Sequence, residues 1–374
     1  MNSKLRFGSQ APAIRIKVLK LVFVNLCFVS VYQGDKMDRR KIETLLKNWD
    51  IGDLISHRPA KKGVVNINLM LKTTKGRYVL RKVAEFTKMS DLEFELDYLT
   101  YLREHGFPYK IPAPVRAKNG EFILRFEGSR FWVYEYIDGT HRKRFGYPEL
   151  RECAKMMAIY HKMVENSGLD NKKGSEEVFN RESVLVELGG FRAQILKREK
   201  RDRKGRIFLK ESSILIPLMR SLDGQEYSKL PTYPVHRDIN PENTLWIDKK
   251  LVGLIDFENV GTMNDTLIKD ISIVLQYSCR DRKQKHKLDL DRAGFFVREY
   301  RKHHPLSDEE IGFLPDIITA AAIEDFAYAY WMLVNDPKRA KLYRLKLYSR
   351  TAQWYHKNKA EIVNGLINRK ACAD

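Results

Sequence analysis

The chain has 374 residues, of which 43% are hydrophobic, and this is enough to build a two-lobed globular protein with real cores. Lysine and arginine exceed aspartate and glutamate by 20 charges, which favours anionic partners such as a nucleotide, an acidic substrate, a membrane surface or nucleic acid. The four cysteines are far apart and form no CxxC pair. This spacing argues against a disulfide framework or a zinc site and predicts a reduced, cytoplasmic protein.

Residues 1–36 carry six basic groups and one acid, and Leu21 to Tyr32 is apolar apart from Asn25 and Ser30. This stretch is shorter than the roughly 20 residues that a membrane-spanning helix needs, and no small-residue cleavage site follows it. We interpret residues 1–36 as a weakly ordered leader or an over-extended start, with a membrane anchor or an additional strand as alternatives. A membrane partner is therefore not expected.

Residues 37–138 are predicted to form a small lobe of mixed helix and strand. A helix over residues 37–57 comes first, and a second helix is indicated by leucines that recur at helical spacing from about Ser90 until Gly106. Short apolar runs between turn residues predict strands. The five expected strands cover residues 62–72, 77–83, 111–115, 121–126 and 130–136.

Residues 139–374 are predicted to be mainly helical. A helix over 150–166 precedes a polar insertion at about 179–226, which is expected to form one or two long helices. A β-hairpin is expected within residues 236–258, a helix then starts near Asp270, and three more helices follow. The predicted fold is therefore α+β and bilobal, with a small β-rich N-terminal lobe, a hinge and a larger helical lobe.

The most informative segment reads HRDINPENTLW over residues 236–246 and is followed by LIDFE at residues 254–258. Asp238 and Asn243 stand at the two ends of a short loop, and the hairpin brings Asp256 beside them. Phosphoryl transfer needs one carboxylate that accepts the hydroxyl proton, together with an Asn and a second Asp that hold Mg²⁺ on the nucleotide phosphates. The alternative interpretation is two surface turns that happen to contain Asp.

With these motifs placed, the chain resembles the aminoglycoside phosphotransferase superfamily, which includes choline kinase, type II homoserine kinase and methylthioribose kinase. The resemblance runs from about Lys62 to Tyr355 and is strongest in HRDINPEN, in LIDFE and at Asp270-Ile271. It implies the protein-kinase-like fold. Family motifs usually read HGD, whereas Arg237 gives this chain the HRD of protein kinases.

Several features favour the small-molecule branch of this fold over the protein kinases. Glu135, at the expected hinge, and Asp238 are 103 residues apart (238 − 135), which leaves room for a helical insertion. Asn240 stands where protein Ser/Thr kinases normally place a Lys, and Glu258 replaces the Gly that would follow Asp-Phe. A glycine-rich loop is missing, with only Gly63 and two asparagines in its place.

The resemblance implies a role for each matching residue. Asp238 would be the catalytic base, and Asn243 and Asp256 would bind Mg²⁺ through oxygen ligands. Arg81 falls where the nucleotide-binding Lys normally sits, with Glu95 in the place of its helix partner; an ordinary surface ion pair is the alternative for these two. The backbone of Glu135 and Ile137 would bind adenine, and Asn66 and Asn68 would take the place of the glycine-rich loop.

The expected function is an ATP- and Mg²⁺-dependent phosphotransferase that phosphorylates a hydroxyl of a small metabolite. An amino alcohol, a homoserine-like compound, a sugar and a choline-like compound remain open as acceptors. The basic excess favours a neutral, zwitterionic or anionic acceptor, bound beside Asp238 and walled by the 179–226 insertion. The alternatives are an atypical protein Ser/Thr kinase and a non-catalytic or nucleic-acid-binding protein, which the net charge of +20 and the basic run at 197–206 favour.

Overall fold

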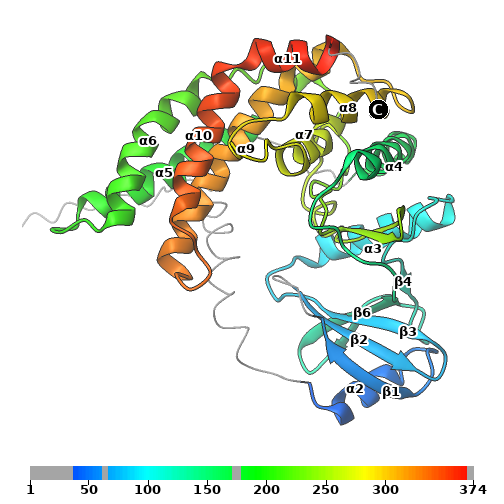
Figure 1. The fold of residues 1–374 in the computed structure, drawn as a ribbon. Coiled ribbons are helices and arrows are strands. Elements are labelled where there is room, and N and C mark those ends of the chain that lie inside the picture. The colour runs from blue at the N-terminus through cyan, green and yellow to red at the C-terminus, as the bar shows by residue number, and fades with distance from the viewer. Residues whose placement is uncertain (1–36, 61–65, 171–177, 369–374) are drawn as a thin grey trace, which may run out of the picture.

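The computed structural model describes residues 37–60, 66–170 and 178–368, so the proposed leader lies outside the described residues. The chain forms two lobes, and a helix of the N-terminal lobe, α3 (Met89–Glu104), lies between its sheet and the helical lobe (Figure 1). The predicted bilobal α+β architecture is confirmed.

A six-stranded antiparallel sheet is the frame of the N-terminal lobe. The strand order is β1-β2-β3-β6-β4, with β5 paired to β6. The register places Asn68 opposite Arg81 and Tyr78 opposite Glu135, which brings three residues of the expected nucleotide side, Asn68, Arg81 and Glu135, onto neighbouring strands. The strands are β1 (Leu54–Pro59), β2 (Ile67–Thr73), β3 (Arg77–Lys82), β4 (Pro114–Val115), β5 (Leu124–Phe126) and β6 (Ser129–Glu135).

The predicted helix over residues 37–57 is wrong in its second half. Helix α2 (Arg39–Leu46) ends early, and β1 begins at Leu54, so the sheet has six strands where five were predicted. Gly52 lies between them with a φ of +80°, a conformation that favours glycine, and a Cβ there would lie 2.3 Å from the Thr74 hydroxyl oxygen. The chain therefore turns back at Gly52 and adds a strand to the edge of the sheet.

The second lobe is built from helices and one short hairpin, β7 (Thr244–Ile247) with β8 (Lys250–Leu254). The polar insertion forms two helices, and four helices follow α7, one more than the sequence predicts. The helices are α4 (Tyr147–Glu165), α5 (Arg181–Leu196), α6 (Arg203–Ser221), α7 (Leu267–Ser278), α8 (Leu290–Arg301), α9 (Asp308–Asn335), α10 (Tyr343–Lys357) and α11 (Lys359–Asn368).

The largest hydrophobic core joins the two lobes, because it packs α3 against α4, α7 and the β7–β8 hairpin. Tyr98 of α3 and Tyr160 of α4 are fully buried in it, and their hydroxyl oxygens lie 2.7 Å apart. A second core holds α5 and α6 against α9 and α10. By length and composition α9 could cross a membrane, but 67% of its most apolar window is buried inside the protein.

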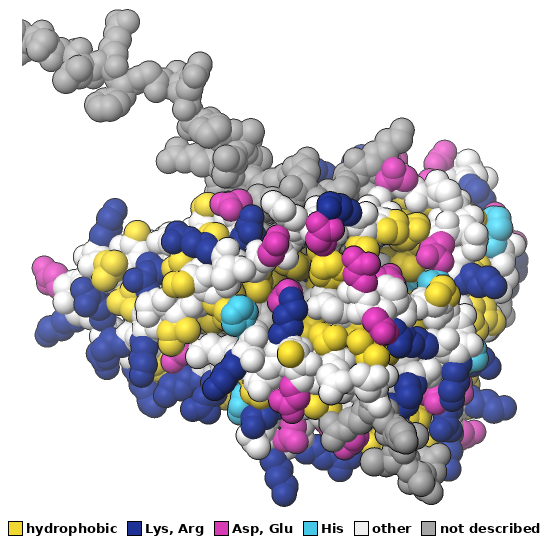
Figure 2. Space-filling model, turned by 90° about the horizontal axis from the view of Figure 1, so that it is seen from above, with side chains coloured by type: hydrophobic (Ala, Val, Ile, Leu, Met, Phe, Trp, Pro, Cys, Tyr) yellow, Lys and Arg dark blue, Asp and Glu magenta, His cyan; other side chains and the backbone are white. Residues whose placement is uncertain are grey.

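The basic run at residues 197–206 forms the turn between α5 and α6. Its lysines and arginines contribute to the dark-blue side chains that gather at this end of the molecule in Figure 2. Seven basic residues and two acids face solvent or the neighbouring turn here, so much of the charge excess lies at one end of the helical lobe.

Candidate active site

Asp238 lies in the loop that precedes β7, and two asparagines hold its carboxylate. Asn240 Nδ2 donates to Oδ1 at 2.7 Å and Asn243 Nδ2 donates to Oδ2 at 2.6 Å. Burial raises the pKa of the Asp238 carboxyl, and the charge of Asp256 raises it further, while His236 and the two amide bonds oppose the rise. The carboxylate is thus fixed in direction and is a better proton acceptor than an exposed aspartate.

Asp270 of α7 supports this loop from below. Its two oxygens accept hydrogen bonds from the backbone N–H groups of His236 at 3.2 Å and Arg237 at 2.5 Å, and His161 Nε2 lies 3.3 Å away. Arg237 has a φ of +60°, a conformation that non-glycine residues adopt only when their surroundings impose it. Helix α7 has Thr266 as its N-cap, so Asp270 does not cap its own helix.

Asp256 follows β8 and meets the loop through backbone contacts. The Ile255 N–H donates to the Asn243 carbonyl at 2.9 Å, and His236 Nε2 lies 3.0 Å from the Ile255 carbonyl. Asp256 itself has a φ of +72°, which turns its carboxylate toward the N-terminal lobe, 3.5 Å from Arg81 Nη2. The three polar residues predicted from the motif therefore lie together at one place between the lobes.

The oxygen groups beside Asp256 fit a magnesium ion. Asn243 uses its amide nitrogen on Asp238, which leaves its amide oxygen as a ligand, and Glu258 adds a second carboxylate two residues after Asp256. Among the described residues, no three His, Cys, Asp or Glu side chains are grouped closely enough to hold a metal by themselves. Magnesium is commonly bound by one or two carboxylates that share it with substrate phosphates, and this donor set matches that mode.

Arg81 of β3 is buried and meets three carboxylates. It pairs with Glu95 of α3 at 3.3 Å and with Glu258 at 3.1 Å, in addition to Asp256. Burial alone would lower the pKa of Arg81, but the charges of Glu95, Glu258 and Asp256 outweigh it and raise the pKa. A permanently charged guanidinium thus faces the place where the phosphates are expected.

Glu258 joins the two lobes, a role that the sequence analysis did not assign to it. Asn66 Nδ2 donates to its carboxylate at 2.7 Å, and Asn66 Oδ1 accepts the N–H of Ala84. Burial and the charge of Asp256 raise the pKa of Glu258 to about 8. Asn68 lies opposite Arg81 on β2, and its Oδ1 is buried without a hydrogen-bond partner in the described part of the chain.

The hinge residues Glu135 and Ile137 lie at the end of β6 and directly after it. The Tyr136 N–H donates to the Arg77 carbonyl, so in the alternating antiparallel pattern the backbone groups of Glu135 point away from β3. A Cβ on Gly253 of β8 would lie 3.0 Å from the Lys110 carbonyl oxygen and 3.1 Å from Ile137 Cγ2, so β8 approaches the hinge closely at this glycine.

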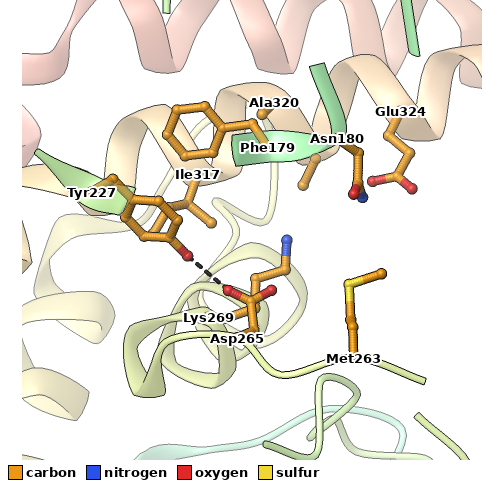
Figure 3. A pocket seen from close by; sticks show the side chains of 10 residues that line it. Phe179, Asn180, Tyr227, Met263, Asp265, Lys269, Ile317, Ala320 and Glu324 are labelled. Atoms are coloured by element: carbon orange, nitrogen blue, oxygen red, sulfur yellow. Dashed lines mark hydrogen bonds between the residues drawn. The ribbon is translucent and has the colours of Figure 1, made fainter. Parts of the chain in front are cut away.

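A small cavity opens between α7 and α9. Figure 3 shows Lys269 of α7 and Glu324 of α9 pointing into it, and the Tyr227 hydroxyl donating to Asp265 at 2.9 Å. Asp265 in turn lies 3.8 Å from Nε of Arg237, the residue before Asp238. The cavity therefore begins next to the catalytic loop, between α7 and α9.

This fold and this arrangement of residues define a kinase-like phosphotransferase. Residues 56–306 match the model of the Phosphotransferase enzyme family, APH, and the chain belongs to this family. The resemblance seen in the sequence is thereby confirmed.

Related proteins indicate which kind of phosphotransferase this chain is similar to. The homoserine kinase of Bradyrhizobium sp. (strain ORS 278) is 28% identical over 283 residues, which are 76% of this chain and 82% of that enzyme. A spectinomycin phosphotransferase in complex with ADP and spectinomycin has a TM-score of 0.61 at 13% identity and covers 88% of this chain and 98% of its own. A microcompartment-associated aminopropanol kinase has a TM-score of 0.61 at 14% identity, covering 87% and 99%. The protein is a small-molecule kinase that phosphorylates a hydroxyl group.

Proposed function

We propose that the protein is an ATP- and Mg²⁺-dependent kinase of a homoserine-like amino-acid alcohol. The observation that carries the reaction type is the contact of Asn243 with Asp238, beside Asp256 and the buried Arg81. The homoserine kinase relative supports the choice of acceptor. ATP, Mg²⁺ and a small hydroxylated substrate are thus the proposed partners, and a cytoplasmic location stays a prediction.

Each residue of the site has its own role in the phosphoryl transfer. Asp238, held by Asn240 and Asn243, orients the acceptor hydroxyl and takes its proton late, because a loose phosphoryl-transfer transition state depends more on positioning than on base strength. Arg81 offsets charge on the phosphates, with Glu95 holding its guanidinium in place. Asp256, Asn243 and Glu258 would hold Mg²⁺, which would supply the remaining charge neutralisation.

The hinge and the loop at the start of β2 complete the proposed nucleotide site. The backbone of Glu135 and Ile137 is free to face adenine on the side away from β3. Asn66 and Asn68 lie over the phosphate side, where Asn66 already reaches Glu258.

A protein kinase would need an activation segment that lays a peptide beside the catalytic loop. Here α7 starts at Leu267, eleven residues after Asp256 (267 − 256), which leaves no room for such a segment. The nucleic-acid alternative rests on residues 197–206, and these form the α5–α6 turn rather than a wall of the site. Both observations support a small acceptor.

The test is a coupled ADP-release assay on the full chain with homoserine, 3-aminopropan-1-ol, choline, sugars, an aminoglycoside and a generic protein substrate. We expect Mg²⁺-dependent turnover to be highest with homoserine and to be lost in Asp238→Asn. Labelling of the protein substrate without turnover of any small alcohol would contradict the proposal. Preference for a sugar or an aminoglycoside would refute the acceptor while leaving the kinase chemistry intact.

A further inference from the structure

A second group of charged side chains lies between α7 and α9, outside the residues assigned above. Asp325 of α9 accepts hydrogen bonds from Gln276 Nε2 at 3.1 Å and from the Tyr277 hydroxyl at 3.3 Å, and both donors are on α7. Burial raises the pKa of Asp325 to about 7, and the charge of Glu324 raises it further. The positive charges of Arg280 and Lys269 act in the opposite direction and lower this pKa. In the described part of the chain neither of them forms a close ion pair with Asp325, whose two hydrogen-bond donors are neutral, so the carboxylate can still accept a cationic ligand.

Tyr277 connects this group to the catalytic base. Burial raises the pKa of the Tyr277 hydroxyl, and the charges of Asp325 and Asp238 raise it further, so the hydroxyl lies in the electrostatic field of both carboxylates. The residue as a whole is 45% exposed, so its ring borders open space. A small molecule beside this ring would lie close to Asp325, which accepts the hydrogen bond of the Tyr277 hydroxyl at 3.3 Å.

Arg280 of the same region carries a positive charge, opposite in sign to the Asp325 carboxylate. Its guanidinium carbon lies 5.2 Å from the centre of the Tyr277 ring, and its Nε donates to the Gln276 carbonyl. Its Nη2 is buried and has no hydrogen-bond partner among the described residues. A buried guanidinium nitrogen without a partner is costly, and a ligand carboxylate is the group that the planar guanidinium matches best.

The cavity of Figure 3 continues this arrangement of alternating charge. Lys269 lines the cavity from α7 and Glu324 from α9. Their charges act on Asp325 in opposite directions, Glu324 raising its pKa and Lys269 lowering it. The space between the two helices thus presents both signs of charge, which suits a zwitterion better than a sugar or a simple cation.

We propose that Asp325 binds the ammonium group of the acceptor and Arg280 its carboxylate, so that the enzyme selects an α-amino acid whose side-chain hydroxyl reaches Asp238. This inference rests on the proposed kinase function and adds the residues that determine its specificity. In the transfer, a bond forms between the acceptor oxygen and the γ-phosphorus, and the bond from that phosphorus to ADP breaks. The hydroxyl proton passes to Asp238 and then to water.

Three compounds separate the two contacts: homoserine, 3-aminopropan-1-ol, which lacks the carboxylate, and 4-hydroxybutyrate, which lacks the ammonium group. Each is measured as a substrate or, where it is not turned over, as a competitive inhibitor of homoserine phosphorylation. Arg280→Met should lower kcat/KM for homoserine by roughly 10–100-fold, the effect of losing charged hydrogen bonds, and leave 3-aminopropan-1-ol little changed. Asp325→Asn should weaken both amines and spare 4-hydroxybutyrate.

Controls separate specificity from damage to the fold. Arg282→Met removes an exposed arginine two residues further on and should behave like the parent protein. Arg280→Lys keeps the charge and should give a smaller loss that is still confined to the carboxylate-bearing compounds. Melting temperature and Mg-ATP affinity are followed for every variant, because a specificity role leaves both near the parent values.

The outcomes distinguish this inference from the function on which it rests. Equal losses for homoserine and 3-aminopropan-1-ol in Arg280→Met, or no difference between Arg280→Met and Arg282→Met, would overturn the assignment while homoserine kinase activity stands. A parent protein that phosphorylates only sugars would overturn both the proposed acceptor and this inference. A carboxylate-selective loss at normal melting temperature supports it.

Discussion

Two groups of carboxylates flank Asp238, one toward the N-terminal lobe and one between α7 and α9, and they differ in how their charge is balanced. On the nucleotide side, three carboxylates surround the buried Arg81 at 3.1–3.5 Å. On the acceptor side, Glu187, Glu324 and Asp325 form no close ion pair with Lys or Arg in the described part of the chain, and burial raises the pKa of both Glu187 and Asp325 to about 7.

This difference in charge pairing indicates which ligand groups each side can bind. The nucleotide side already holds a cation that is paired at close range and can meet phosphates. On the acceptor side Arg280 and Lys269 act on Asp325 without forming a close ion pair in the described part of the chain, so both signs of charge remain open to a ligand. The net charge of +20 says little about the acceptor cleft, because the basic run at residues 197–206 lies at the α5–α6 turn. Local pairing, and not the total charge, determines the ligand.

The largest effect on activity is expected at Asp238, which lies between the nucleotide side and the acceptor side. Asp238→Asn keeps the volume and most hydrogen bonds but removes the proton acceptor, so kcat should fall by about 10³-fold while Mg-ATP affinity and melting temperature stay near the parent values. Steady-state kinetics and calorimetry check this. Asp248→Asn, an exposed position in the β7–β8 turn, is the matched control. Turnover within tenfold of the parent would remove Asp238 from the role of base.

On the nucleotide side, Asp256→Asn should abolish the gain in nucleotide affinity that Mg²⁺ gives. Asparagine tolerates the φ of +72° at this position, so the variant should fold, but it has no charge to offer the metal. We expect Mg-ATP affinity to fall by roughly 10–100-fold, the effect of losing a charged ligand. Titration calorimetry with and without Mg²⁺ measures it. An unchanged Mg²⁺ dependence would place the metal elsewhere.

Arg81→Met tests the balance of charge on the nucleotide side directly. Without the guanidinium, Glu95, Asp256 and Glu258 are left together without their cation, which costs about 3–5 kcal/mol for a buried pair that loses one partner. The melting temperature should therefore fall by about 6–20 °C. Lys82→Met on the same strand removes a less buried cation and should shift it much less. Equal shifts in both variants would show that Arg81 does not balance these carboxylates.

The residues at the catalytic loop could be predicted because their spacing is imposed by a short loop and a tight hairpin. Asp238, Asn243 and Asp256 lie within one continuous stretch, so few arrangements were open to them. Glu258 was quoted in the motif but not assigned, because its contact with Asn66 depends on how the lobes pack. The helix predicted over 37–57 failed because Gly52, at positive φ, turns the chain into β1.

The acceptor side could not be predicted because its members come from helices far apart in the chain. Asp325 lies in the apolar stretch AAIEDFAYAY, and an acidic pair in such a stretch is the one signal that could have found it. Arg280 and Tyr277 carry no motif at all. Their position depends on how α7 packs against α9, which helical periodicity leaves open.

The smallest expected effect concerns Glu187 of α5, a carboxylate on the acceptor side that has no cation beside it. Burial and the charge of Glu324 raise its pKa from 4.5 to about 7, so the folded protein holds this proton more tightly than the unfolded chain does. The resulting cost to stability is absent below about pH 4.5, grows as the pH rises and is complete above about pH 7. Glu187→Gln removes the cost.

The Glu187→Gln variant should therefore melt about 2–4 °C above the parent at pH 8, the shift that about 1 kcal/mol gives in a domain of 150–250 residues, and close to the parent at pH 4.5. Scanning calorimetry at both pH values, with the exposed Glu199→Gln as control, measures the difference. A stabilisation that is equal at both pH values would mean that Glu187 is not an unbalanced charge, and the contrast between the two sides would then rest on Asp325 and Glu324 alone.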